Sequence, residues 1–226
     1  MSDPIKHECG IALIRLLKPL NYYQEKYGSA LYGIKKMQLI MAKQLNRGQD
    51  GAGIGVIKID PPFGKRYIAR KRSNAKDAVA DIFEEVIRKY EELPGDKREN
   101  TEYLKANYPY AGELIVGHNR YATHSGNSLE NLHPFLRQNN WMSRNLVIAG
   151  NYNMTNVDEL FEQLISLGQH PKEISDNVTM LEKIGHFLDE ENNRLYRKYK
   201  AEGLEGLKSD LQNRVKIYKS KYGKLP

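Results

Sequence analysis

The chain has 226 residues, of which 40% are hydrophobic and 28% are charged, and it contains 18 glycines and 9 prolines. This composition excludes fibrous, low-complexity and largely disordered proteins, and a chain of this length buries roughly 70% of the surface that its unfolded form exposes. No apolar run approaches the roughly 20 residues that span a bilayer, and the polar start, MSDPIKHE, lacks the apolar segment of a signal peptide. We therefore predict a cytoplasmic globular protein with no membrane partner.

The formal net charge of +7 is concentrated in the last part of the chain. Residues 194–226 hold ten Lys/Arg and three acidic residues, whereas residues 1–193 hold 25 of each sign. A lysine-rich tail with a helical pattern is more typical of a solvated face, or of a surface for a neighbouring domain, than of a nucleic-acid site. The sequence therefore predicts no nucleic-acid partner. The alternative, binding through the tail, predicts an affinity that is sensitive to salt and is lost when residues 194–226 are removed.

The first half of the chain combines apolar runs with helical patterns. Its predicted elements are a strand at 9–17, a helix at 30–45, a strand at 54–59 and a helix whose apolar positions run from 79 to 90. Ser73 or Asn74 is expected to cap the second helix, since a short polar side chain can accept a hydrogen bond from the first helical turn. The polar stretch 95–110 is expected to be a surface excursion.

The second half continues with strands and then only with helices. Its predicted elements are strands at 112–123 and 145–150, a helix from Thr155 or Asn156 to Gly168, and a long helix that Ser175 caps and that continues into the basic tail. Strands follow one another directly in some places and are separated by helices in others. This order, without any internal repeat, favours an α+β layered fold over a doubly wound sheet.

The candidate chemistry lies at Cys9 and in three segments that follow predicted strands. A lone cysteine in an apolar setting is most often a packing residue, and one cysteine excludes an internal disulfide or a multi-cysteine zinc site. The six histidines lack the i, i+4 spacing of a helical zinc site, so no metal site is predicted. The three segments are 47–53 (RGQDGAG), 117–123 (GHNRYAT) and 150–156 (GNYNMTN).

These segments occur together with CGI at 9–11, NLHPF at 131–135 and Ser175-Asp176. In this order they resemble class II glutamine amidotransferase domains, which are N-terminal-nucleophile hydrolases, and the resemblance covers residues 9 to about 185. The RGQD turn and the short leader before Cys9 are most similar to the glutaminase domain of the amidophosphoribosyltransferase branch. His124, which follows the RYAT sequence, is closer to the glucosamine-6-phosphate synthase branch.

The resemblance implies a fold and a division of the chain. The implied fold is a four-layer αββα sandwich that is incomplete at its C-terminus. Residues 1–8 would be a leader that is removed to expose Cys9, residues 9–193 the amidotransferase domain, and residues 194–226 a basic helical tail that leads to a missing C-terminal region. The implied partners are glutamine and a synthetic, phosphoribosyltransferase-like domain or subunit. No cofactor is implied for this domain, and the oligomeric state stays open.

The implied reaction requires a proton acceptor for the thiol of Cys9, because only the thiolate is a strong nucleophile. No histidine adjoins Cys9 in the sequence. An α-amino group has a reference pKa of about 7.7 to 8.0, so a usable fraction is neutral at neutral pH and accepts a proton. The hypothesis therefore requires that residues 1–8 be cut off, which makes Cys9 both nucleophile and base.

The resemblance also implies roles for the other site residues. The planar guanidinium of Arg120 suits the α-carboxylate of glutamine, and the alternative for this residue is a surface ion pair. The assigned roles are binding of the substrate carboxylate by Arg120 and Thr123, binding of its ammonium group by Asp176, stabilisation of the oxyanion by the Asn151 side chain and the backbone N–H of Tyr152, and support of the site by Arg47 and Gly48.

The sequence departs from the family pattern at three positions. Tyr152 stands where family members carry glycine, and it would cost about 1 to 3 kcal/mol if the site needs a positive φ there. Asn46 replaces a histidine before the RGQD turn, and Ser125 is inserted before Gly126.

Three functions are therefore considered. The first is hydrolysis of glutamine to glutamate and ammonia through a cysteine-bound γ-glutamyl intermediate, with ammonia supplied to phosphoribosyl pyrophosphate for purine synthesis. The second is an amidotransferase for another acceptor, such as a sugar phosphate or an aspartyl adenylate. The third is a non-catalytic module that keeps the fold while Tyr152 disables the oxyanion site.

Overall fold

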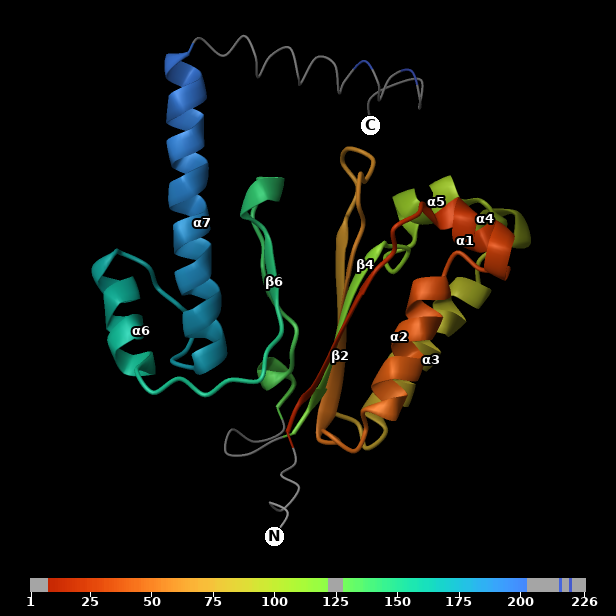
Figure 1. Cartoon of the computed structure of the whole chain (residues 1–226), viewed down its shortest axis with the longest axis horizontal. Helices are drawn as coiled ribbons and strands as arrows, with labels where there is room; N and C mark the ends of the chain where they lie inside the picture. Colours follow the sequence, from red (N-terminus) through yellow and green to blue (C-terminus); the bar gives the residue numbers. More distant parts are fainter. Residues whose placement is uncertain (1–7, 122–127, 203–215, 217–219, 221–226) are drawn as a thin grey trace. The chain divides into compact units, whose positions relative to one another are not determined.

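The computed structural model describes residues 8–121, 128–202, 216 and 220. The chain divides into two compact units, one formed by residues 1–134 and 148–151, the other by residues 135–147 and 152–226. The described residues form an α+β structure, with a four-stranded antiparallel sheet in the first unit (Figure 1). A four-layer sandwich stays a prediction.

The sheet of the first unit has the strand order β1-β4-β2-β3. Its strands are β1 (Gly10–Arg15), β2 (Gly51–Ile57), β3 (Ile68–Ser73) and β4 (Leu114–Arg120). The register pairs Ile11 with His118 and His118 with Gly53. Because directly paired residues point to the same face of a sheet, these three residues share one face.

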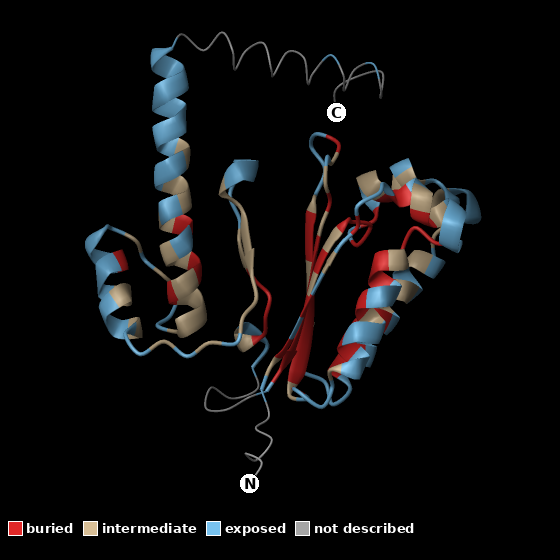
Figure 2. Cartoon of the chain, in the orientation of Figure 1, coloured by how far each residue is buried: buried red, intermediate tan, exposed pale blue. Residues whose placement is uncertain are grey.

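The described part of the first unit contains five α-helices, and two of them cover the other face of the sheet. The helices are α1 (Leu20–Tyr27), α2 (Tyr32–Lys43), α3 (Ala78–Glu91), α4 (Gly95–Glu99) and α5 (Thr101–Asn107). Helices α2 and α3 pack on the strands (Figure 1), and the core lies between these layers (Figure 2). Phe83 of α3 and Met37 of α2 are completely buried there with Ile54 of β2, and each buried side chain of this size contributes roughly 1.5 to 3 kcal/mol.

Residues 129–134 cross the second face of the sheet over the glycines of β2. A Cβ atom on Gly53 would lie 1.9 Å from the backbone oxygen of His133, and a Cβ on Gly51 would lie 2.7 Å from the Leu132 side chain. The guanidinium of Arg72 in β3 donates to the carbonyls of Glu130 and Leu132 at 3.2 and 3.0 Å. The absence of side chains at Gly51 and Gly53 therefore lets this segment lie directly on the backbone of the sheet.

Among the residues that the structure describes, the second unit contains a two-stranded sheet and two α-helices. Its elements are β5 (Phe135–Arg137), β6 (Leu146–Ile148), α6 (Val157–Ser166) and α7 (Asp176–Ala201). The hydroxyl of Ser175 accepts a hydrogen bond from the backbone N–H of Val178 at 3.3 Å, which confirms the predicted N-cap of the long helix. Helix α7 contacts both α6 and β5.

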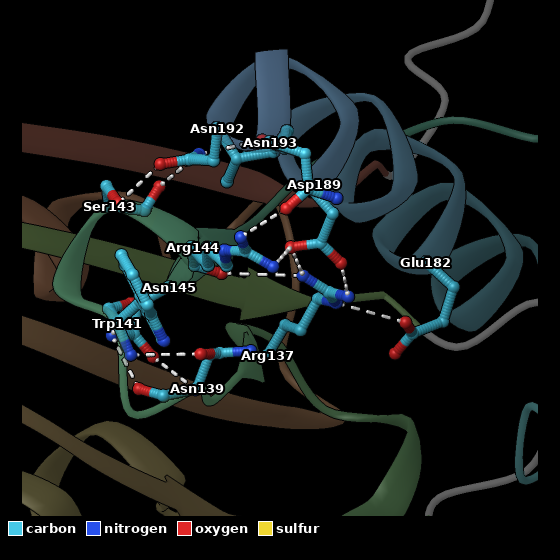
Figure 3. Close-up of polar contacts among 11 residues, drawn as sticks. Arg137, Asn139, Trp141, Ser143, Arg144, Asn145, Glu182, Asp189, Asn192 and Asn193 are labelled. Carbon is cyan, nitrogen blue, oxygen red and sulfur yellow. Dashed lines mark hydrogen bonds and ion pairs between the residues drawn. The ribbon is translucent and has the colours of Figure 1, made fainter. Parts of the chain in front are cut away.

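Ion pairs attach α7 to β5 within the second unit (Figure 3). The guanidinium of Arg137 bonds Asp189 at 2.5 Å and Glu182 at 3.2 Å, and Arg144 lies 3.7 Å from Asp189. These carboxylates raise the pKa of Arg137. Gly185 gives the guanidinium its space, since a Cβ there would lie 2.5 Å from Nε of Arg137.

Most predicted elements are present, but the predicted cap of α3 is wrong. The cap of α3 is Asp77 rather than Ser73 or Asn74, because Ser73 is the last residue of β3, a strand that the sequence pattern did not indicate. The polar stretch 95–110 contains the short helices α4 and α5. Leu104 of α5 is completely buried, and tertiary packing of this one leucine outweighs the polar composition around it.

Candidate active site

Cys9 lies immediately before β1, beside the end of β4. Its Sγ atom accepts a hydrogen bond from the backbone N–H of Tyr121 at 3.4 Å and lies 3.8 Å from the Tyr121 carbonyl oxygen. The cysteine is half-buried. These two contacts hold the sulfur against the backbone at the end of β4, a position that suits a nucleophile as well as a packing residue.

Arg120 is the last residue of β4, next to Tyr121. Its side chain is buried, with 6% of the residue exposed, and one guanidinium nitrogen donates to the backbone carbonyl of Asn131. Arg120 is therefore a buried residue whose guanidinium contacts the backbone of the 129–134 segment. Binding of a substrate carboxylate by this guanidinium stays a prediction.

The RGQD turn packs against the backbone at the end of β4. A Cβ atom on Gly48 would lie 2.4 Å from the backbone carbon of Arg120, and the N–H of Asp50 donates to the Arg120 carbonyl at 3.0 Å. Gly48 is needed for this close approach and not for a positive φ, which it does not have. The turn thus packs closely on the strand end that carries Arg120, and support of an active site by Gly48 stays a prediction.

Asn151 contacts the residue that precedes Cys9. Its side-chain nitrogen donates to the carboxylate of Glu8 at 3.4 Å, and Arg47 lies 3.6 Å from the same carboxylate. Both members of the ion pair are about half exposed, so the pair adds little stability. The contact nevertheless brings the Glu8 carboxylate to the side chain of the predicted oxyanion donor. Sequence reasoning missed Glu8, because nothing in the sequence indicates that residues 8 and 151 meet.

His118 connects β4 to the segment that carries Asn151. The Nε2 atom of His118 lies 3.1 Å from the Gly150 carbonyl oxygen, and the imidazole rings of His118 and His133 lie 4.3 Å apart. His118 is 1% exposed. Burial, His133 and Arg120 lower the pKa of His118 to about 3, although the Gly150 carbonyl opposes this shift. His118 is thus a buried, hydrogen-bonded residue of β4.

Tyr152 and Asp176 belong to the second unit. The carboxylate of Asp176, in the first turn of α7, accepts a hydrogen bond from the backbone N–H of Met154 at 3.0 Å. Burial, with the negative charge of Asp176, raises the pKa of Tyr152 to about 12, so its hydroxyl stays neutral. Among the described residues, the one non-glycine residue with a positive φ is Asp60. The φ of Tyr152 is therefore not positive. The strain expected at Tyr152 is therefore absent.

The structure brings together only part of the predicted site. Cys9, Arg47, Gly48, Arg120 and Asn151 all lie in the first unit and are linked through Tyr121, Glu8 and the backbone of Arg120. Tyr152 and Asp176 are described within the second unit. The predicted residue Thr123 lies outside the described residues, as do His124 and Ser125.

The described residues hold no group of three or more His, Cys, Asp or Glu side chains arranged for a metal ion. A search of the same residues finds no helix long and apolar enough to cross a membrane. A cavity of about 400 Å³ lies behind the RGQD turn, lined by Gly48, Gln49 and the start of α3, but Cys9, Arg120 and Asn151 do not line it.

The chain is similar to a known enzyme over most of its length. It is 29% identical over 161 residues to an amidophosphoribosyltransferase of Bacillus subtilis (strain 168), and the match covers 69% of this chain and 26% of the relative. The chain thus spans about a quarter of the length of the curated relative that it matches. No protein-family model matches the chain.

Proposed function

We propose that the chain is a glutamine amidotransferase domain that hydrolyses glutamine to glutamate and ammonia and supplies the ammonia for amination of phosphoribosyl pyrophosphate in purine synthesis. The observation that carries this proposal is the convergence of Cys9, Arg120 and Asn151, which are far apart in the sequence, at the ends of β1 and β4. Similarity to an amidophosphoribosyltransferase supports the choice of acceptor.

The reaction begins after removal of residues 1–8. The free α-amino group of Cys9 takes the thiol proton, and the thiolate attacks the side-chain amide carbon of glutamine. The Asn151 amide and the backbone N–H of Tyr152 donate to the oxyanion, and each such donor contributes roughly 3 to 4 kcal/mol to stabilisation of the transition state. The carbon–nitrogen bond breaks, the nitrogen takes the proton from the α-amino group, and ammonia leaves.

The second half of the reaction removes the glutamyl group from Cys9. The α-amino group accepts a proton from water, the resulting hydroxide attacks the thioester carbon, and the sulfur leaves as the thiolate. The products are glutamate and the free enzyme, so one water molecule is consumed for each glutamine. During both steps, Arg120 and Thr123 hold the substrate carboxylate, and Asp176 holds its ammonium group.

The leader contact supports the requirement for cleavage. With residues 1–8 attached, the nitrogen of Cys9 is an amide that accepts no proton, and the Asn151 side chain donates to Glu8. Removal of the leader therefore creates the base and frees the oxyanion donor in one step. We expect the uncleaved chain to hydrolyse no glutamine.

The single cysteine allows a direct test of this proposal. Cys9 is the single thiol of the chain, and we expect glutamine to slow its alkylation by iodoacetamide while asparagine does not. Cys9→Ala should lower the glutaminase rate on the order of 1,000-fold or more. Mass spectrometry of the active protein should show that residues 1–8 are absent.

A chain that begins with Met followed directly by Cys9 provides the matched control for leader cleavage, because removal of the initiator Met exposes the same cysteine. It should equal the processed protein in glutaminase rate. Activity in a chain that retains residues 1–8 would contradict the mechanism. A correctly exposed Cys9 without glutaminase activity would contradict the proposed function and support the non-catalytic module.

A further inference from the structure

The first unit contains a buried histidine to which the proposed reaction gives no role. His118 is 1% exposed and lies on β4, two residues before Arg120. Its ring faces away from the α2 and α3 layer, on the side of the sheet where Ile11 and Gly53 are its register partners. Apolar packing alone does not require an imidazole at this position, since burying a polar ring has a cost unless the ring forms hydrogen bonds.

The hydrogen bond of His118 defines where its proton lies. A carbonyl oxygen only accepts, so the 3.1 Å contact with the Gly150 oxygen requires a proton on Nε2. A neutral imidazole has one N–H, which is then directed at Gly150. The ring of His133 lies against His118, with its centroid 4.3 Å away and its plane tilted by 31°, and limits rotation of the imidazole.

The bonded carbonyl immediately precedes the residue with the candidate oxyanion donor. Gly150 has no side chain to restrict its own backbone, so its conformation depends on contacts of its peptide groups. The next residue is Asn151, and its side-chain amide is this donor. A shift of about 1 Å in the position of a donor can reduce a reaction rate on the order of 100-fold.

We propose that His118 is a positioning residue, whose Nε2–H holds the Gly150 carbonyl and thereby places the Asn151 side-chain amide to stabilise the oxyanion. His118 touches neither substrate nor the reacting atoms in this role. The inference rests on the proposed function, because the hydrogen bond between His118 and Gly150 can assist the reaction only if Asn151 stabilises an oxyanion.

Two amide substitutions test the role of the Nε2–H. His118→Gln places its amide nitrogen the same number of bonds from Cα as Nε2, whereas the amide of His118→Asn is one bond shorter. We expect His118→Asn to lower kcat for glutamine hydrolysis about 10- to 100-fold with little change in KM, because substrate binding groups are untouched. His118→Gln should stay within about threefold of the wild-type kcat. Equal losses in the two variants, or a loss confined to KM, would overturn the proposal.

Ile115→Val is the control for general destabilisation, since Ile115 is buried on the opposite face of the same strand. It should leave kcat unchanged while lowering stability.

Two measurements are independent of activity. Nitrogen NMR of the histidines should show His118 as the Nε2–H tautomer, and amide hydrogen exchange at residues 150–151 should be about tenfold faster in His118→Asn than in His118→Gln or Ile115→Val. Equal exchange in all variants would overturn the positioning role. A wild-type protein without glutaminase activity would instead contradict the proposed function, and the exchange result would still decide whether His118 holds this segment.

Discussion

Gly53 shows how one missing side chain determines the packing of the first unit. A Cβ on this residue would lie 1.9 Å from the backbone oxygen of His133, a distance that requires movement of the backbone. We expect Gly53→Ala to lower the free energy of unfolding by about 2 kcal/mol or more, as overpacking does in a close-packed interior. Urea unfolding followed by circular dichroism measures this loss.

Gly95 is the matched control, because a Cβ there meets nothing within 4 Å and Gly95 lies in the first turn of α4. Gly95→Ala should change stability by less than about 0.5 kcal/mol. Equal effects of the two alanine substitutions would show that segment 129–134 does not lie on β2 as described.

His118 should make the protein sensitive to acid. Its folded-state pKa of about 3 is below the unfolded value of 6.5, so between these values the unfolded chain binds the additional proton. The contribution of His118 to the free energy of unfolding is therefore fully present above pH 6.5. It is lost as the pH falls toward 3, by at most about 1.4 kcal/mol per pH unit. We expect His118→Gln to reduce this slope in urea unfolding at pH 7, 5 and 4. Parallel curves for the two proteins would contradict the burial of a neutral His118.

At the level of elements, Arg137 and Asp189 connect β5 to α7. Their side chains are 17% and 26% exposed, and Arg144 lies near the same carboxylate. Asp189→Asn removes the negative charge and leaves two guanidinium groups close together. We expect a loss of about 1 to 3 kcal/mol in stability of the second unit, measured as faster amide exchange in α7. The control is Glu190→Gln, because the Glu190 side chain is 62% exposed and should contribute under about 1 kcal/mol. Equal amide exchange rates in Asp189→Asn and Glu190→Gln would show that the Arg137 contacts do not stabilise α7.

Elements with strong local patterns were predictable, and those that depend on distant packing were not. The apolar periodicity of α2 and α3 and the apolar runs of β1, β2 and β4 indicated these elements correctly. Strand β3 (IARKRS) was not predicted, because four of its six residues are polar. It forms by pairing with β2. Helix α5 has the N-cap Asn100, whose side chain accepts from the N–H of Tyr103, a signal that polar composition concealed.

For the molecule as a whole, the surplus of positive charge and the candidate site residues lie in different parts of the sequence. All candidate site residues precede residue 177, whereas the surplus of positive charge lies in residues 194–226. Replacing the six Lys/Arg of residues 203–226 with Gln lowers the formal net charge from +7 to +1. We expect glutaminase activity to stay within about twofold, and we expect neither protein to bind a single-stranded oligonucleotide at 0.15 M salt, where charges are screened beyond about 8 Å. Tight, salt-sensitive binding that the substitutions abolish would support the nucleic-acid alternative.

The sequence by itself determined the order of the motifs, the main helices and strands, and Cys9 as the candidate nucleophile, because residue types and short-range periodicity are local properties. Only the tertiary structure showed that Glu8 meets Asn151, that Arg120 is buried against Asn131, and that His118 bonds Gly150. These contacts join residues up to 143 positions apart. No local pattern encodes them, since they exist only where folding of the sheet brings distant segments to the same strand ends.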